Sequence, residues 1–472
     1  MELETVIGLE IHVQLNTKTK LFCNCDNDAF GAKPNSRVCP VCMGFPGMLP
    51  VLNKEALEKG ALIGAALGCE IKSFSKFDRK NYFYPDLPNG FQISQFDQPI
   101  TEKGKLEIEV DGVIKKIGIT RAHLENDAGK LTHESDGTLC DYNRAGTPLL
   151  EIVTDPDLRS PEEAQILAKE IQKIVRFVHA SDADMEKGMM RFDASISLRP
   201  RGSKKFYSRT EIKNLNSFSS LLKALKYELK RQKKLWETDQ VSTSETTVGW
   251  LDEKQQTQLL REKESANDYR YFPEPDLPPV TFSQEEIKKI KELIPELPLA
   301  KYHRYQSEYG ISAQDALKLS ESEKLYVFFE KSADLSGNPK KVAGLILSVV
   351  LADSQWEVSK ITPEHLSDVI NLQEIGKISS SAAKEIVIEA METGEAVEDI
   401  IETKGLEQKS DSEEIESWVD EVIAQNPQVV DAICFGGKPK MIQFLMGKVM
   451  QKTKGQANPP MVMQTLKEKL KV

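Results

Sequence analysis

Residues 5–15, Thr-Val-Ile-Gly-Leu-Glu-Ile-His-Val-Gln-Leu, alternate almost without exception between an apolar face and a second face of different character. Successive side chains of a β-strand point to opposite faces, so this pattern predicts a strand with one buried face. The other face carries Glu10 and His12, whose spacing lets both side chains reach one ion or phosphate. A polar pair on a half-exposed strand is more often simply solvated, so this pair alone does not define a site.

Further strand patterns and a few helices follow this first strand. Alternating patterns recur at 105–110, 113–121, 149–154 and 191–198. Helices are predicted from the N-cap Asn53 to near Gly68, from Ser160 towards His179, and along the leucine stripe at 221–229. Strands joined this way favour an α+β domain built mainly on an antiparallel sheet.

The pattern changes after Ser283, where alternation fades and short capped helices follow one another. We therefore predict an α+β cradle domain over 1–293, an all-helical domain over 294–405 and a small helical tail domain over 406–472. A chain of 472 residues is long enough for several cores.

Bulk composition restricts the class of protein. The chain has no apolar run approaching the roughly 20 residues that span a bilayer, and its start lacks the basic region of a signal peptide. We therefore expect a cytoplasmic protein without membrane contact. Its seven cysteines, an odd number, argue against a disulfide framework in that compartment.

Positive charge is concentrated in two segments although the net charge is −11. Residues 201–234 contain eleven lysines or arginines and two glutamates, and the chain from Ala432 onward contains eight lysines and one glutamate. Such segregated charge suits a polyanion such as RNA. A solvated helix face explains either segment about equally well.

Carboxylates and imidazoles gather at several strand ends and suggest a metal site. His123 and Glu125 end one predicted strand, Asp193 lies beside Arg191 in another, and Glu151 lies inside an otherwise apolar strand. A carboxylate in such a strand is seldom buried unless it is paired or binds a cation. Oxygen ligands with one imidazole are compatible with Mg²⁺ at a nucleotide.

The two commonest phosphate-binding sequences are missing, because the chain has neither a Walker A motif nor G-x-G-x-x-G. Arg79 and Lys80 could supply phosphate-facing charge instead.

Four cysteines form two close pairs, Cys23 with Cys25 and Cys39 with Cys42, separated by a turn-rich segment. Four thiolates in this spacing are typical of a structural zinc site, here a knuckle over 23–42. The alternative is that these are reduced cysteines without a metal.

Several long motifs carry a family resemblance. They are the aromatic and charged segment 76–99, Glu10-Ile-His12, Asp127-Ala-Gly-Lys130, Arg270-Tyr-Phe-Pro-Glu-Pro-Asp276 and Lys454-Gly-Gln-Ala-Asn-Pro459. Together they resemble the B-subunit family of the glutamyl/aspartyl-tRNA amidotransferases from end to end. The resemblance implies that the first domain is an unconventional ATP-dependent kinase. It also implies that Mg²⁺ is held by His12, Glu125 and Glu151, with Glu10 beside them.

The reaction implied by this resemblance is amidation. Glutamate misacylated onto the glutamine tRNA, or aspartate on the asparagine tRNA, is phosphorylated on its side chain, and ammonia then displaces the phosphate. Asp193, Glu211 and Lys213 are candidates for orienting the acceptor. The chain has no amidase-type Ser-Ser-Lys signature and no cysteine nucleophile motif, so ammonia must come from another chain.

The resemblance implies partners as well. Ammonia would come from a separate amidase subunit, and a third, small subunit would complete a heterotrimer. The helical and tail domains would hold the misacylated tRNA, with the following lysines as binding candidates: Lys438, Lys440, Lys448, Lys452 and Lys454. No stretch has room for the synthetase-like insertion of archaeal relatives, which favours the bacterial or organellar three-subunit form.

Two other functions fit part of these observations. A non-catalytic tRNA-binding scaffold would have the same basic segments, with zinc and carboxylates serving structure alone. A metal-dependent hydrolase, the weaker alternative, would turn over without tRNA. Substitution by neutral isosteres would distinguish the scaffold from the kinase. If the chain is a scaffold, ATP turnover should not change, and if it is a kinase, turnover should be lost. The residues to substitute are Glu10, His12, Glu125 and Glu151.

Overall fold

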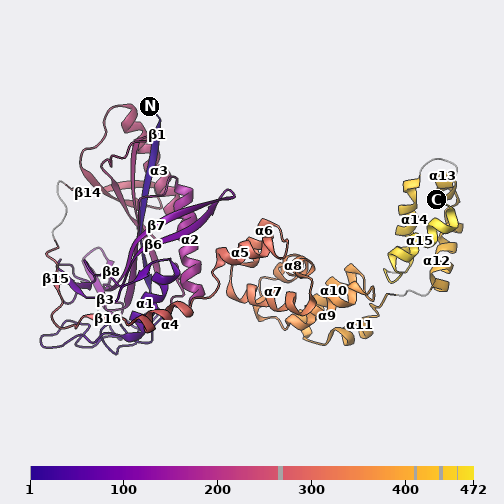
Figure 1. Ribbon diagram of the computed structural model, residues 1–472, viewed down its shortest axis with the longest axis horizontal. Coiled ribbons are helices and arrows are strands. Elements are labelled where there is room, and N and C mark those ends of the chain that lie inside the picture. The colour runs from indigo at the N-terminus through magenta and orange to yellow at the C-terminus, as the bar shows by residue number, and fades with distance from the viewer. Residues whose placement is uncertain (1, 264–268, 409–411, 435–438, 454, 472) are drawn as a thin grey trace. The chain divides into compact units, whose positions relative to one another are not determined.

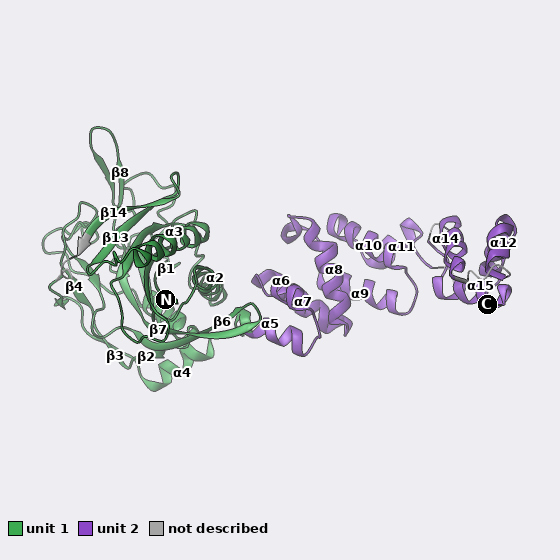
Figure 2. Ribbon diagram, turned by 90° about the horizontal axis from the view of Figure 1, so that it is seen from above, with its two compact units in different colours: residues 1–299 green, residues 300–472 purple. Residues whose placement is uncertain are grey.

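The computed structural model describes the chain except for residues 1, 264–268, 409–411, 435–438, 454 and 472. It divides into two compact units, residues 1–299 and 300–472, drawn in different colours in Figure 2. The α+β character of the first part and the helical character of the second are confirmed. The finer division into three domains with limits at 293 and 405 stays a prediction.

A nine-stranded sheet forms the framework of unit 1 (Figure 1). Its strands, in spatial order, are β14 (Gln256–Lys263), β13 (Glu245–Leu251), β12 (Thr210–Leu215), β11 (Met190–Pro200), β1 (Leu3–Gln14), β10 (Pro148–Thr154), β7 (Val113–Asn126), β6 (Thr101–Val110) and β2 (Glu70–Ile71). All neighbours pair antiparallel except β12 and β13, which are parallel. The predicted antiparallel sheet is therefore confirmed, with the first strand of the chain at its centre.

Three helices cover one face of this sheet: α1 (Lys54–Ala66), α2 (Pro161–Phe177) and α3 (Phe218–Glu237). Local sequence sets where the first two begin. The Asn53 side chain accepts hydrogen bonds from the backbone N–H groups of Glu55 and Ala56, and Ser160 caps α2 with a proline at its first position.

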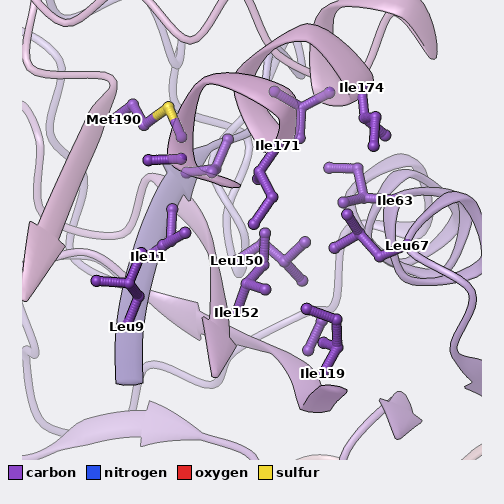
Figure 3. Packing of buried hydrophobic residues seen from close by; sticks show 14 of the residues in the cluster. Leu9, Ile11, Ile63, Leu67, Ile119, Leu150, Ile152, Ile171, Ile174 and Met190 are labelled. Carbon is purple, nitrogen blue, oxygen red and sulfur yellow. The ribbon is translucent and has the colours of Figure 1, made fainter. Parts of the chain in front are cut away.

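The core lies between these helices and the sheet. Figure 3 shows Leu9 and Ile11 of β1 and Ile152 of β10 facing Ile171 of α2 and Ile63 of α1. All five side chains are buried. Burying such aliphatic side chains stabilises the fold by about 1.5–3 kcal/mol each. This face fixes the strand register, because a slip by one residue would carry apolar side chains to the opposite face.

Three small sheets and a fourth helix complete unit 1. The small sheets are β15 (Phe272–Pro273) with β4 (Asp78–Lys80) and β5 (Gln92–Ser94), β16 (Val280–Thr281) with β3 (Phe74–Ser75), and the hairpin β8 (Lys130–His133) with β9 (Thr138–Asp141). Helix α4 (Gln284–Glu292) begins with a capping box between Ser283 and Glu286. The segment after β14 thus returns to pair with residues 74–79, far earlier in the chain.

The remaining described elements are helical. They are α5 (Pro298–Ser307), α6 (Ala313–Leu319), α7 (Glu323–Ser336), α8 (Pro339–Ser348), η1 (Val350–Ala352), η2 (Trp356–Val358), α9 (Pro363–Glu374), α10 (Ser380–Thr393), α11 (Val397–Lys404), α12 (Ser412–Gln425), α13 (Pro427–Cys434), η3 (Pro439–Met441), α14 (Ile442–Lys452) and α15 (Pro459–Leu470). The last helices share a hydrophobic cluster that includes Ile415, Val419, Leu445 and Leu466. No helix among the described residues combines the length and apolar character that crossing a membrane requires.

Candidate functional site

The sheet face opposite the helices is polar along its central strands. Strand β1 turns Leu9 and Ile11 towards the core, so Glu10 and His12 lie on this second face. Antiparallel register places Glu10 opposite Asp193 of β11 and His12 opposite Glu151 of β10. Residues directly opposite each other share a face, so the alternation of one strand organises side chains from its neighbours.

A first cluster forms around His12. Its Nε2 atom lies 3.5 Å from Glu151 Oε2 and 3.8 Å from Glu125 Oε1. On β7, His123 is directly opposite Glu151, and its Nε2 atom lies 3.6 Å from Glu151 Oε2. Ligand atoms of His12, Glu125 and Glu151 all lie within 4.8 Å of one another, so one ion could be held among them.

Burial and mutual charge shift the pKa values in this cluster. Burial, reinforced by the negative charge of Glu151, raises the pKa of Glu125 to about 6. Burial also acts to raise the pKa of Glu151, but His123 and His12 hold that pKa well below its usual range. Two buried carboxylates this close favour a bound cation, which would let both ionise.

Two further ring nitrogens of this cluster are unsatisfied. The Nδ1 atoms of His12 and His123 are buried and have no hydrogen-bond partner within the described parts of the chain. Buried polar atoms are normally paired, so these two atoms call for a partner such as a water molecule, whereas the Nε2 atoms are the ones that face the carboxylates. The donor set of one imidazole nitrogen and carboxylate oxygens fits a hard divalent cation such as Mg²⁺.

A second cluster lies next to the first on the same face. Glu10, Asp193 and Glu211 have carboxylate oxygens within 4.8 Å of one another. Lys213 Nζ joins two of them, at 2.7 Å from Asp193 Oδ2 and 2.9 Å from Glu211 Oε1. Burial, followed by the charge of Glu151 and of Asp193, raises the pKa of Glu10.

A cleft opens at this second cluster. It has a volume of about 350 Å³ and is lined by Glu10, Asp193 and Glu211 together with the aromatic residues Phe206 and Tyr207. The structure therefore brings together the residues that the sequence suggested for orienting an acceptor.

Arg79 and Lys80 are separated by the geometry of β4, because neighbouring residues of a strand point to opposite faces. Arg79 makes a bidentate ion pair with the buried Glu274, at 2.7 and 2.8 Å. Lys80 lies over the rings of Tyr269 and Tyr82, at 5.0 and 5.5 Å from their centroids.

The charge environment of Lys80 links it to the first cluster. Burial acts to lower the pKa of Lys80, but the charges of Glu125 and Glu151 raise that pKa above its usual value. Of the two predicted cations, only Lys80 has its pKa shifted by the carboxylates of this cluster. Arg79 pairs with Glu274 instead. The role of Arg79 at a phosphate stays a prediction.

The four predicted cysteines lie together. Their Sγ atoms are all within 4.8 Å of one another, and those of Cys25 and Cys42 are 3.9 Å apart. Four thiolates about 2.3 Å from one tetrahedral zinc ion lie about 3.8 Å apart, so the cluster fits zinc. Hydrogen bonding from the Cys23 thiol is the main reason that the pKa of Cys42 falls to about 5, and the charge of Lys20 acts in the same direction.

The candidate tRNA-binding lysines can be described only in part. Lys438 and Lys454 lie outside the described residues. Lys440, Lys448 and Lys452 are exposed; Lys452 pairs with Glu421, and Lys448 Nζ lies 5.6 Å from the Phe444 ring centroid. Nothing in their geometry tests RNA binding, so that role stays a prediction.

One charged residue of the polar face was missed by the sequence analysis. Arg121 of β7 follows Thr120, at a point where the register between β7 and β10 shifts. The signal was present in the sequence, because the apolar positions change phase from Ile117 and Ile119 to Ala122 and Leu124. Such a change of phase marks a β-bulge.

Comparison with known protein families agrees with this geometry. Residues 5–288, which contain all but the first two residues of the sheet and every carboxylate, histidine and cysteine cluster described above, match the family model of the GatB/GatE catalytic domain. Residues 327–470, within the helical unit, match the model of the GatB domain. The polar face therefore lies in a catalytic domain of this type.

Full-length relatives give the same result. The chain is 46% identical over 479 residues to the B subunit of the aspartyl/glutamyl-tRNA(Asn/Gln) amidotransferase of Carboxydothermus hydrogenoformans, with 99% of both chains covered. It is 46% identical over 476 residues to the protein of the same name from Thermoanaerobacter pseudethanolicus, with 100% of both covered, and 47% identical over 468 residues to that of Thermodesulfovibrio yellowstonii, with 98% of both covered. The chain belongs to the GatB/GatE family.

Proposed function

We propose that this chain is the B subunit of a tRNA-dependent amidotransferase. It uses ATP to activate the side-chain carboxylate of glutamate or aspartate misacylated onto the glutamine or asparagine tRNA. Amidation of that carboxylate then gives the correctly charged tRNA. The observation that carries this proposal is the convergence of His12, Glu125 and Glu151 on one sheet face within the catalytic domain.

The chemistry comprises two displacements. A carboxylate oxygen of the aminoacyl group attacks the terminal phosphorus of ATP, the bond from that phosphorus to the bridging oxygen breaks, and ADP leaves with the electron pair. Ammonia then attacks the acyl carbon, phosphate leaves, and loss of a proton gives the amide. Phosphoryl transfer of this kind depends on positioning and charge neutralisation rather than on covalent help from the protein.

The protein's own groups provide the positioning. His12, Glu125 and Glu151 would hold Mg²⁺, which, when bound, neutralises phosphate charge. Lys80 supplies a positive charge held close to these carboxylates by the surrounding tyrosine rings. Lys213 pairs with Asp193 and Glu211, two residues that line the adjoining cleft, and can orient the acceptor carboxylate there.

Ammonia has to be supplied by another chain. We assign that supply to a separate amidase subunit that acts on glutamine, with a third, small subunit completing the heterotrimer. The absence of a glutaminase motif in the sequence supports this division of labour.

Zinc at the four cysteines would have a structural role. The knuckle joins loop residues 23–42 into one unit, and Lys20 Nζ lies 3.7 Å from Cys42 Sγ and 3.3 Å from the Tyr142 carbonyl oxygen. Because all four sulfur atoms would be occupied by the metal, no position is left for a reacting group.

The experiment that tests this function measures phosphate release from ATP by the assembled heterotrimer. Misacylated Glu-tRNA, misacylated Asp-tRNA and uncharged tRNA are compared. We expect release that depends on a misacylated tRNA, and a loss of roughly 100-fold or more in Glu125→Gln. The matched control is Glu107→Gln, which removes an exposed carboxylate of β6 that pairs with Lys116.

Two results would contradict the proposal. Phosphate release that ignores the charging state of the tRNA and survives Glu125→Gln would leave the chain a tRNA-binding scaffold. Turnover that needs the metal but no tRNA would instead indicate a hydrolase.

A further inference from the structure

Strand β7 contains a β-bulge that changes which residues face the site. Ile119 is opposite Thr154 of β10, but the next pair is Arg121 opposite Val153, so Thr120 is left over. A bulge of this kind inserts one residue into a strand and reverses the alternation after it. Without it, Arg121 would continue the core-facing series of Ile117 and Ile119.

The bulge therefore turns Arg121 onto the polar face, in line with His123 and Glu125. Same-face neighbours along a strand are roughly 7 Å apart. One polyanionic ligand is long enough to reach both Arg121 and the His12 cluster.

The contacts of Arg121 leave much of its hydrogen-bonding capacity unused. Its Nη1 atom donates to the carbonyl oxygen of Phe96 at 3.3 Å, while its Nε atom is buried and has no partner within the described ranges. Its cross-strand neighbour Glu102 is bound by Lys72 at 2.7 Å instead. A buried donor without a partner is unusual in a native protein.

Other cations near the polar face are already engaged. Arg191 binds Asp127 at 2.8 Å, and Lys213 binds Asp193 at 2.7 Å. Arg121 differs from these two, because it forms no ion pair with a carboxylate in the part of the chain that the structure describes. A guanidinium that remains available beside a cation site is suited to an oxyanion, which it can bind through two parallel hydrogen bonds.

We propose that Arg121 binds a phosphate group of the nucleotide substrate. This role rests on the function proposed above and adds a residue that binds phosphate to the groups already assigned there. The bulge at Thr120 positions Arg121 for this role, because it sets the direction of the Arg121 side chain. The ring of Tyr271, stacked on Phe96 with centroids 4.1 Å apart, supports the segment that accepts the hydrogen bond from Arg121.

Equilibrium binding to the assembled heterotrimer tests the proposal without requiring turnover. Dissociation constants for ATP, ADP and adenosine are measured by calorimetry in the presence of Mg²⁺ for the wild type, Arg121→Gln and Arg121→Lys. We expect Arg121→Gln to weaken ATP binding roughly 10- to 100-fold, which is typical for hydrogen bonds to a charged group. Adenosine binding should not change, and Arg121→Lys should retain part of the affinity as a point charge.

The matched control is Lys116→Gln, an exposed cation on the same strand, which should bind ATP as the wild type does. Equal ATP affinity in the wild type and Arg121→Gln, with unchanged melting temperatures, would overturn the proposal. Loss of tRNA affinity with ATP affinity intact would also overturn it, by assigning Arg121 to the RNA backbone. If the wild type itself bound no ATP, the proposed function would fail first, which distinguishes the two failures.

Discussion

Asp127 is the residue that ties the central strands to the loop after β7. It is 1% exposed, accepts a hydrogen bond from Arg191 at 2.8 Å and one from Gln14 at 2.9 Å, and lies 3.6 Å from Arg144 Nε. These partners come from β11, from β1 and from the segment before β10. Removing its charge would leave two partly buried guanidinium groups without their carboxylate.

We predict that Asp127→Asn lowers the free energy of unfolding by about 3 kcal/mol, the lower end of the range for breaking a buried pair. The lower end applies because the Arg191 and Arg144 side chains are each about one-third exposed. Thermal unfolding at neutral pH measures the change. Asp136→Asn, on the exposed β8–β9 turn, is the control and should leave the melting temperature unchanged.

The same residue predicts a pH dependence. Burial acts to raise the pKa of Asp127, but Arg191 and Arg144 lower it below the ordinary value. A carboxylate with a lowered folded-state pKa stabilises the protein above its unfolded pKa of about 3.9, and this contribution is lost as the pH falls through the folded pKa. The stability difference between wild type and Asp127→Asn should therefore shrink below about pH 4, and a difference that grew there would contradict the assignment.

Single residues differed in how far the sequence could reveal their roles. Glu151 was conspicuous because it interrupts an aliphatic strand, and Glu10 and His12 because they alternate with buried residues. The ion pair between Arg79 and Glu274 joins positions far apart in the chain, and no local pattern reports such a contact. Alternation thus predicts a face, whereas pairing across the fold requires the structure.

At the scale of elements, strand β6 contains a residue with a strained backbone opposite the bulge of β7. Lys103 of β6 has a positive φ of 58°, and its neighbours Glu102 and Gly104 pair with Arg121 and Ile119 on either side of Thr120. A left-handed conformation is unfavourable for a residue with a Cβ atom and is readily adopted by glycine.

We predict that Lys103→Gly raises the free energy of unfolding by about 0.5–1 kcal/mol, because relief of strain exceeds the entropic cost of glycine. Lys105→Gly is the control. Lys105 lies in the same strand with an extended backbone, so this substitution should lower the free energy of unfolding. Differential scanning calorimetry of both variants checks the opposite signs. A decrease in stability for both would show that Lys103 is not strained.

Helices were easier to place from the sequence than short strands. Caps such as Asn53, Ser160 and Ser283 are local signals, and the structure confirms the helices that they predicted. Strands of two or three residues, such as β4 and β15, exist because distant segments pair, so their own sequences carry little periodicity. The alternating pattern of β7 could be followed only to residue 121, although His123 and Glu125 were placed at the end of a strand, because the bulge interrupts the alternation.

At the scale of the whole molecule, the two units have separate cores. The large cluster in unit 1 includes residues from Ile7 to Ile290, and the last helices of unit 2 have a cluster of their own. The order of an α+β part followed by a helical part could be read from the change in periodicity alone. The limits of the predicted domains stay predictions, because the chain after residue 284 is a series of short helices without a comparable change of pattern.

We predict that residues 1–299 fold without the rest of the chain and bind ATP with Mg²⁺ as the full chain does. This fragment should contain one zinc ion per chain, because all four cysteines lie within it. It should lose most of its affinity for tRNA, because the lysine-rich tail is missing. Circular dichroism, zinc analysis and RNA binding at two salt concentrations test these points, and unchanged tRNA affinity would assign RNA binding to unit 1.

The bulge at Thr120 also limits how this protein can diverge during evolution. At Thr120, deletion or insertion of a single codon would exchange the inward and outward faces of the rest of β7 and displace Arg121, His123 and Glu125 together. Substitutions can be tested by selection one position at a time, but a change of length here alters three site residues in one event. Lineages that retain the activity are therefore expected to keep the length of this segment constant even where its side chains vary.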